Sequence, residues 1–301
     1  MTQDEWERVR RLEWVVMEFW LTQAFNGISY GAMLFLLASG LSLTFGVMRI
    51  VNLSHGSYFL LGGYVGLSTV WATGNFVLAL AAGAVAVCVI GIAMERLFLR
   101  RLQKQALAQV LMTMGFALCF QDLAMLIWGG DPYQIRVPSI LAGSIRAGPV
   151  IAPVYRIFII AVAVAVGMVL WLFLERTKMG ARVRATVDDW EMAEGVGINV
   201  PLVLAGVFAL GAFLAALGGV VGAGFIGVYP GLDFEVLPFA FVVVIVGGLG
   251  SLYGVMVGSL LVGLLDNFGK ALFPELSYFT LFAPMALILA LKPTGLFGKA
   301  S

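Results

Sequence analysis

The sequence predicts an all-α integral membrane protein with about eight or nine transmembrane helices and two glycine-broken segments. Of its 301 residues 61% are hydrophobic and only 12% are charged, whereas soluble domains carry about 25% charged residues. Several apolar blocks match the roughly 20 residues that a helix needs to cross the hydrocarbon layer. The net charge of +1 gives no indication of a nucleic-acid partner.

Residues 1–20 predict an amphipathic N-terminal tail. Apolar side chains recur in it at helical spacing, at Trp6, Val9, Leu12, Val16 and Trp20. This pattern favours a helix that lies at the membrane interface and leads into the first span, with a partly disordered tail as the alternative. No small-residue cleavage site is present, so we do not expect a secretory signal.

A single transmembrane domain is predicted over residues 21–298. The candidate spans are 21–45, 57–74, 76–98, 107–128, 154–175, 201–228 and 277–291. A further apolar block is divided by the glycine-rich run Gly247–Ser251 into halves of 235–247 and 254–268, and a similar break lies at Gly46–Gly56. Glycines four residues apart, such as Gly27 and Gly31, predict close packing of helix backbones.

The positive-inside rule predicts which side of the membrane each end of the chain occupies. Lysines and arginines gather at 96–104, at 176–184 and at Lys292 and Lys299. These stretches are therefore expected in the cytoplasm, which gives nine passes with the N-terminus outside and the C-terminus inside. The arginines of the N-terminal tail argue against that side. The outer segment 129–153 is rich in proline and glycine and should not form one continuous helix.

The first break predicts polar contacts inside the membrane. It reads GVMRIVNLSHG and holds Asn52, Ser54, His55 and Gly56, with His55 as the sole histidine of the chain. Helix ends near the membrane midplane aim free backbone N–H groups inward, which suits a carboxylate or another polar solute. The alternative is that these side chains only cap helices, as Asn52 or Ser54 would do well, and satisfy backbone groups.

The second break, VGGLGSLYG, occupies the matching place in the other half of the chain. It holds Gly247, Gly248, Gly250 and Ser251 ahead of a helix of small residues. Paired interruptions in corresponding positions indicate a transport path, and a packing bend is the alternative.

Few acids lie inside apolar blocks, and no enzymatic motif is present. Asp122 and Asp266 would serve a self-contained ion-coupled carrier, which is a second hypothesis. One histidine excludes HExxH, and neither a GxSxG nucleophile motif nor a phosphate-binding GxxxxGK[ST] loop appears. Cys88 and Cys119 lie in apolar blocks, where cysteine is usually a small buried hydrophobe. We expect neither an enzyme nor a metal site.

The longest polar interruption, 175–201, predicts a surface on which another protein docks. A short amphipathic helix is expected over 186–195, begun by Thr186 or Asp188 and stopped by Gly195 and Gly197. Val187, Trp190 and Ala193 would share one face, with Asp188, Glu191 and Glu194 toward the other. A solvated loop is the alternative.

This interruption, TKMGARVRAT…MAEGVGINVP, resembles the cytoplasmic EAA-type coupling loop of bacterial ABC importer permeases. The resemblance extends over about 20–298 and is closest to H-type permease subunits of the high-affinity branched-chain amino-acid importers. Its other pieces are NGISYGAMLFLLASGLSLTFGVMRIVNLSHGSYFLLGGYVG, FVVVIVGGLGSLYGVMVGSLLVG and KPTGLFG. It implies that the coupling loop contains Gly180, Arg182, Ala193, Gly195 and Ile198, to which the predicted helix adds Asp188, Trp190 and Glu191. It also implies that the two breaks line or shape a solute path.

The resemblance further implies a location and partners. It implies a multi-pass subunit of the bacterial inner membrane that translocates branched-chain amino acids or a related small polar or organic-acid solute. Two ATP-binding subunits, a second homologous permease in a heterodimer and a periplasmic solute-binding protein are the expected partners. No cofactor is expected in this chain, because the partner subunits bind ATP. One departure is Phe239, at a position where family members often carry lysine.

Overall fold

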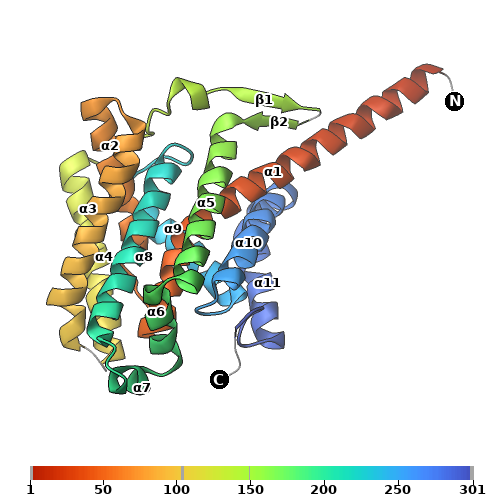
Figure 1. Cartoon of the computed structure of the whole chain (residues 1–301). Helices are drawn as coiled ribbons and strands as arrows, with labels where there is room; N and C mark the ends of the chain where they lie inside the picture. Colours follow the sequence, from red (N-terminus) through yellow and green to blue (C-terminus); the bar gives the residue numbers. More distant parts are fainter. Residues whose placement is uncertain (1–2, 103–104, 149, 299–301) are drawn as a thin grey trace.

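The computed structural model describes residues 3–102, 105–148 and 150–298. The predicted apolar positions Trp6, Val9 and Leu12 and the tail arginines lie outside the described side chains, and Lys104 and Lys299 lie outside the described residues. Helix α1 (Gln3–Met48) runs without interruption from the tail into the first predicted span and projects beyond the other helices (Figure 1). The interfacial position of the tail stays a prediction.

The described residues form eleven α-helices, three short 3₁₀ helices and one antiparallel hairpin. The remaining α-helices are α2 (His55–Thr73), α3 (Phe76–Leu97), α4 (Ala106–Trp128), α5 (Val154–Arg176), α6 (Lys178–Asp188), α7 (Trp190–Gly195), α8 (Val200–Ala223), α9 (Leu232–Gly247), α10 (Leu252–Leu272) and α11 (Ser277–Leu291). The short elements are η1 (Leu99–Leu102), η2 (Ser139–Leu141), η3 (Pro274–Leu276), β1 (Ser144–Ala147) and β2 (Val150–Pro153).

The chain is a multi-pass helical membrane protein. Six stretches of helix in the described part are long and apolar enough to span: Val16–Met48, Phe76–Leu102, Ala106–Trp128, Val154–Arg176, Val200–Ala223 and Leu252–Leu272. The other predicted blocks correspond to α2, α9 and α11. The predicted block 201–228 was too long, because α8 ends at Ala223 and the chain then leaves the helix. Segment 129–153 forms η2 and the β1–β2 hairpin and no continuous helix, as its prolines and glycines predicted.

Helix α8 lies at the centre of the bundle and contacts α1, α2 and α3. Its sequence is apolar on all sides, as expected of a helix surrounded by protein. Glycines allow the close approach: a Cβ on Gly40 of α1 would meet the backbone of Gly211 in α8. Gly27 and Gly31 likewise abut the backbone of α10, so the predicted role of the paired glycines is confirmed there.

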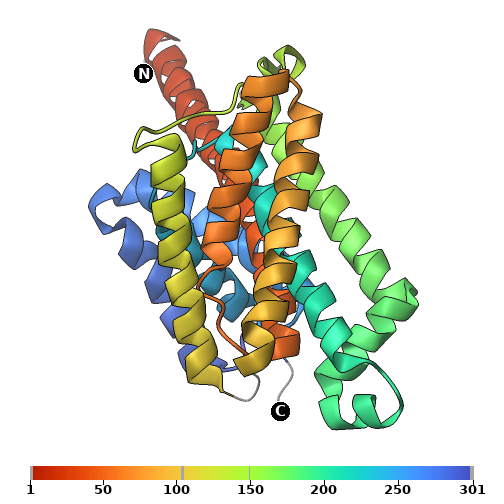
Figure 2. The same ribbon diagram turned by 90° about the vertical axis from the view of Figure 1, so that its left-hand side faces the viewer.

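Helix α2 begins well inside the bundle. Gly62 packs on Ala216 of α8, and the two helices run in the same direction (Figure 2). Counting back seven residues from this contact leads to His55 in α2 and to Ala209 in α8, so these two residues lie at the same depth. Ala209 is nine residues after Val200, where α8 begins. At 1.5 Å per residue, α2 therefore starts ~13 Å above the start of α8.

Helix α9 starts beside the start of α2. A Cβ on Gly56 would meet the backbone carbonyl of Asp233, so the first turns of the two helices touch. Residues 224–231 descend from the top of α8 to reach this depth, and Val228 pairs with Tyr133 on the way. Two helix N-termini, each with its positive dipole end, thus meet within the bundle.

The two ends of the bundle differ in composition. The hairpin β1–β2 and the N-terminus lie at one end, called here the hairpin end (Figure 1). Helices α6 and α7 and the C-terminus lie at the other, and η1 with its arginines lies there as well (Figures 1 and 2). We call this second end the basic end.

Candidate translocation and coupling sites

A buried polar cluster occupies the first break, between α1 and α2. The side chains of Asn52, Ser54 and His55 are each at most 1% exposed. The Asn52 Oδ1 accepts hydrogen bonds from the Ser54 hydroxyl at 2.7 Å and the Ser54 N–H at 3.1 Å. The backbone N–H of Leu53 donates to the Thr113 hydroxyl of α4 at 3.1 Å. The break is therefore folded into the bundle and braced from α4.

Two polar atoms of this cluster have no partner among the described residues. The His55 Nε2 lies 2.9 Å from the carbonyl oxygen of Leu37. Because a carbonyl only accepts, Nε2 carries the proton in the neutral ring, and Nδ1 is left as an acceptor. This Nδ1 and the Asn52 Nδ2, which is a donor, are both buried without a hydrogen bond. One donor and one acceptor thus stand ready for a polar group.

Of the alternative roles of this break, helix capping by Ser54 is not observed, whereas Asn52 and His55 do bond backbone groups, at Ser54 and Leu37. Ser54 occupies the N-cap position of α2, yet its side chain makes no capping bond. Its hydroxyl is turned to Asn52 instead. Gly56 has a packing role, because it allows the contact with Asp233 described above.

The second break, between α9 and α10, is a packed turn. Gly248 and Gly250 have φ of +104° and +76°, which favour glycine. The C-terminal segment covers the turn: the N–H groups of Leu296 and Phe297 donate to the carbonyls of Val246 and Gly247 at 2.9 and 3.0 Å. These carbonyls end α9 and have no partner inside the helix. The tail sequence KPTGLFG therefore caps a helix.

The remaining residues of the second break join elements together. Gly247 packs against the backbone of Gly254 in α10. The Ser251 hydroxyl accepts the N–H of Gly254 at 3.1 Å and so caps α10. A Cβ on Gly46 would lie 3.0 Å from the Gly250 Cα, so the two predicted breaks meet at this point.

The polar interruption at the basic end forms two helices instead of the single helix predicted over 186–195. Helix α6 continues to Asp188, and α7 starts at Trp190 after Asp189, whose φ of −150° and ψ of 107° are extended. The Asp189 carboxylate accepts the N–H of Met192 at 2.9 Å. Asp189 therefore caps α7, while Thr186 and Asp188 lie in the last turns of α6. The predicted stop is confirmed: α7 ends at Gly195, and Gly197 has a φ of +88°.

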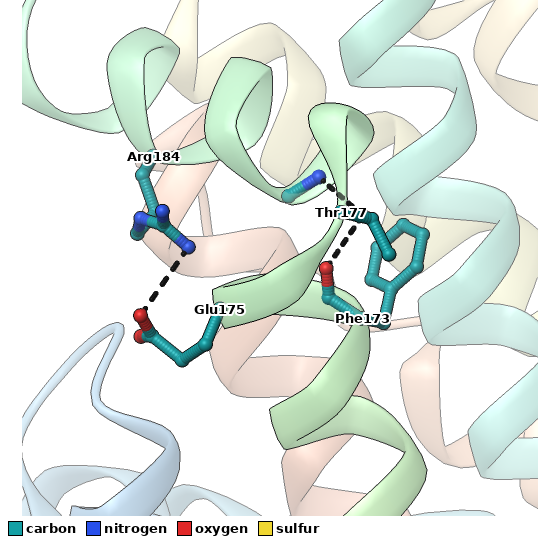
Figure 3. A network of polar contacts seen from close by, with 5 residues as sticks. Phe173, Glu175, Thr177 and Arg184 are labelled. Carbon is teal, nitrogen blue, oxygen red and sulfur yellow. Dashed lines mark hydrogen bonds and ion pairs between the residues drawn. The ribbon is translucent and has the colours of Figure 1, made fainter.

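One threonine links α5 to α6 (Figure 3). The Thr177 hydroxyl donates to the Phe173 carbonyl of α5 at 2.6 Å and accepts the N–H of Gly180 in α6 at 3.0 Å. Arg184 of α6 lies 3.6 Å from Glu175 of α5. A Cβ on Gly180 would meet the last carbonyls of α5. Helix α6 is thus fixed at a sharp bend to α5, and we call α6 and α7 together the elbow.

The elbow packs one face on the bundle and presents the other. Val187, Trp190, Ala193 and Ile198 belong to a small apolar cluster with the start of α8. The tryptophan is therefore half-buried, on the face that it shares with Val187 and Ala193. Arg182, Asp188, Glu191 and Gly195 are exposed. So are two apolar side chains that the sequence analysis passed over, Met192 at 65% and Val196 at 70%.

A family comparison decides what kind of protein carries this elbow. Residues 23–291 match the family model described as "Branched-chain amino acid transport system / permease component". The chain belongs to this permease family. It is accordingly a transport component and not itself an enzyme. The resemblance stated from the motifs alone is confirmed.

Individual relatives cover nearly the whole permease. The high-affinity branched-chain amino acid transport system permease protein BraD of Pseudomonas aeruginosa is 28% identical over 297 residues, which are 93% of this chain and 96% of BraD. LivH of Escherichia coli K12, the permease protein of the same kind of system, is 30% identical with the same coverage. A solved complex, PsaBC from Streptococcus pneumoniae with Fab, covers 88% of this chain at 13% identity with a TM-score of 0.47, which is too loose to support an argument.

The acids of the permease are distributed differently from the sequence-based expectation. Asp122 is exposed on α4, whereas Asp266 is buried in α10 and pairs with Lys270 at 2.7 Å. The comparisons give no support to the ion-coupled carrier that these two aspartates would have served.

Two buried acids were missed or misplaced by the sequence analysis. Glu95 of α3 is fully buried, and neither of its carboxylate oxygens has a hydrogen-bond partner in the described residues. It follows the buried positions Val87 and Gly91 at helical spacing, which is the signal that would have found it. Asp233, which precedes the predicted block 235–247, is buried where α2 and α9 meet and accepts the Ser57 hydroxyl at 2.8 Å.

Proposed function

We propose that this chain is the membrane-spanning permease subunit of a binding-protein-dependent ABC importer in the bacterial inner membrane. Its solute would be a branched-chain amino acid or a related small polar or organic-acid molecule, as the names of its relatives suggest. The chain has no phosphate-binding loop of its own, so two partner subunits bind and hydrolyse the ATP. A second homologous permease and a periplasmic solute-binding protein complete the importer.

The observation that carries this proposal is the construction of the elbow. Thr177 and the close fit of Gly180 couple α6 to the end of α5, and the apolar cluster couples α7 to the start of α8. A push on the exposed face would therefore be transmitted to two membrane helices as a rigid displacement. Exposed Met192 and Val196 beside charged Glu191 give a docking surface with an apolar centre and a polar edge.

The proposed orientation places the basic end in the cytoplasm. The arginines of η1, those of α6 and Lys292 all belong to this end, in agreement with the positive-inside rule. The hairpin end then faces the periplasm and receives the binding protein. Nine passes, an outside N-terminus and an inside C-terminus follow.

The proposed solute path passes the first break. Asn52, Ser54, His55 and Gly56 lie where α2 and α9 begin, and the unpartnered Asn52 Nδ2 and His55 Nδ1 support a contact with a polar solute. Gly247, Gly248, Gly250 and Ser251 shape the path from a distance by holding α9 against α10. Movement of the elbow would change access to the first break through α8.

Substitutions on the exposed face of α7 test the coupling. A Cβ on Gly195 would meet nothing within 4 Å, so Gly195→Leu leaves the packing of this subunit intact. We expect Gly195→Leu and the charge reversal Glu191→Lys each to lower ATP-driven uptake about tenfold or more, the loss caused by roughly 1.4 kcal/mol in the docking equilibrium. Uptake is measured in proteoliposomes that contain the complete importer, and membrane insertion is checked on the same samples.

A matched control separates docking from a general effect of a larger side chain. Gly115 of α4 is also helical and also has nothing within 4 Å, but it lies away from the elbow. Gly115→Leu should retain normal uptake. Normal solute-driven uptake in both α7 variants would refute the assignment of the elbow as the docking site.

A further inference from the structure

A polar pocket that contains none of the path residues named above lies toward the hairpin end of the bundle. It has a volume of about 250 Å³ and is formed by α1, the 224–231 segment, α9 and α10. Helix α10 starts beside the second break at the basic end, so Lys270 in its last turn lies at the end of α10 that points away from the basic end. Neither the family match nor the names of the relatives assign a role to this pocket.

One cation stands at a fixed place in this pocket. The Lys270 ammonium donates to the Asp266 carboxylate at 2.7 Å, and Asp266 is only 4% exposed at its side chain. The same ammonium lies 5.6 Å from the ring centre of Tyr30 and 5.9 Å from that of Phe239. The rings meet edge to face at 6.0 Å. A lysine ammonium has three N–H donors, so Lys270 keeps donors for a further acceptor and is 55% exposed to receive it.

An acid stands on the other side of the same pocket. The Glu235 carboxylate accepts the hydroxyl of Tyr229 through Oε2 at 2.7 Å, which fixes its direction. Glu235 is exposed and belongs to the first turn of α9. Since an ionised carboxylate accepts several hydrogen bonds, Glu235 can also receive an ammonium group.

The rest of the pocket is apolar and small. Ile226, Leu232 and Val236 line it together with the ring of Phe239. Drug-sized ligands occupy pockets of about 300 Å³ and more, so this one suits a smaller solute. The pocket thus combines a fixed cation, a fixed acid and an apolar wall.

We infer that this pocket transiently binds the zwitterion of a small apolar amino acid as it leaves the binding protein. Lys270 receives the α-carboxylate, Glu235 receives the α-ammonium group, and the apolar wall takes the side chain. This inference rests on the proposed import function and deepens it, because it selects free amino acids over organic acids or simple amides.

The charge of the pocket favours this chemistry over a purely anionic solute. Asp266 already neutralises much of the Lys270 charge at short range, and Glu235 adds a second acid. An anion without an ammonium group would therefore meet repulsion from Glu235. An amine without a carboxylate would meet the like charge of the Lys270 ammonium and gain no contact with it.

Protection of an introduced cysteine tests the inference. In the complete importer, Cys88 and Cys119 of this chain are replaced by alanine, and Ile226→Cys is introduced in the pocket wall. Its labelling by a small thiol-reactive reagent is followed on this chain after gel separation. We expect L-leucine to slow the labelling, while isocaproate, which lacks the ammonium, and isoamylamine, which lacks the carboxylate, require about tenfold higher concentrations. Ser144→Cys in the exposed hairpin is the control, and no solute should protect it.

Charge-removing variants assign the two ends of the zwitterion. With Glu235→Gln, leucine should protect no better than isocaproate does in the parent. Lys270→Met leaves Asp266 buried without its partner, so the double variant Lys270→Met/Asp266→Asn is made beside it, and leucine should then protect no better than isoamylamine. Lys270→Arg, which keeps the positive charge, should retain protection by leucine. If the ion pair between Lys270 and Asp266 had only a structural role, its removal would change the stability of the importer but not the order in which the three ligands protect.

The possible outcomes test the pocket, the proposed solute and the zwitterion separately. An importer that takes up leucine while the pocket cysteine is labelled equally fast with and without it overturns the pocket and leaves the proposed function standing. Protection by leucine in an importer that does not take it up retains the pocket and overturns the proposed solute. Equal protection by leucine and isoamylamine makes this an amine site and refutes the zwitterion.

Discussion

The turn at 49–54 between α1 and α2 and the turn at 248–251 between α9 and α10 interrupt the same bundle in different ways. The first is lined by buried polar side chains and leaves a donor on Asn52 and an acceptor on His55 without partners. The second has its free carbonyls capped by the C-terminal segment and its glycines in conformations with positive φ. The first break therefore leaves polar side-chain atoms without hydrogen bonds inside the bundle, whereas the second break has its backbone carbonyls hydrogen-bonded.

This difference shows what a glycine break means in a membrane protein. Glycine permits close backbone approach and positive φ, and both uses are structural. A solute path needs polar groups that are held in place but keep free hydrogen-bonding atoms for the solute. Such unsatisfied buried groups lower stability, so we expect them only where function requires them. By that criterion we propose that the first break contacts the solute and that the second is a joint.

Substitution of the joint should have the largest effect on stability. Gly248→Ala places a Cβ against the backbone of Gly298 and forces alanine to a φ of +104°. We expect a loss of about 3 kcal/mol or more, from the strained backbone together with the clash. Thermal unfolding of the purified complex in detergent measures the change.

A second glycine separates strain from clash. Gly129 has a φ of +83°, but a Cβ there would meet nothing within 4 Å. Gly129→Ala should therefore cost less than Gly248→Ala, about 1–3 kcal/mol, because only the backbone conformation (φ +83°, ψ −174°), which is almost exclusive to glycine, is strained. Equal losses in the two variants would mean that the C-terminal segment does not press on the joint.

Substitution in the first break should lower both transport and stability. Asn52→Ala removes the acceptor for two Ser54 donors and the unpartnered amide of Asn52 itself. We expect a stability loss of about 1–3 kcal/mol from the buried donors left unsatisfied. Solute uptake should fall at least about tenfold, the effect of one lost hydrogen bond to the solute. Uptake per inserted molecule, measured in proteoliposomes, distinguishes the two effects, and unchanged uptake would remove Asn52 from the path.

Local signals in the sequence were sufficient for much of this fold. The length of the apolar blocks predicted the helices, and the prolines and glycines of 129–153 predicted the irregular outer segment. Gly195 and Gly197 predicted where the elbow ends. The helix break at Asp189 could also have been predicted from local sequence, because aspartate is a good N-cap and its carboxylate accepts the N–H of Met192. The acids on either side of Asp189 favoured a single helix that starts earlier.

The parts that could not be predicted depend on contacts between distant segments. The depth at which α2 and α9 begin is set by packing of Gly62 on Ala216 and of Gly56 on Asp233. The approach of Lys270 to Phe239 joins residues of two helices, and the capping of α9 needs the last residues of the chain. Patterns within one helix carry no information about such pairs. For that reason the sequence could suggest candidate path residues, which stay a prediction, but it could not show why the two breaks differ.

The smallest expected effect is at the hydroxyl of the joint. Ser251→Ala removes only the cap that accepts the N–H of Gly254 at 3.1 Å. We expect a stability loss of about 1 kcal/mol, which is typical of a lost N-cap, and unchanged uptake per inserted molecule. Ser251→Asn, which can cap as well as serine, should restore the stability. If Ser251→Ala lowered uptake as strongly as Asn52→Ala does, then both breaks would contact the solute. The distinction between site and joint would then be wrong, because a side chain whose only role is to cap α10 has no way to change transport without first changing stability.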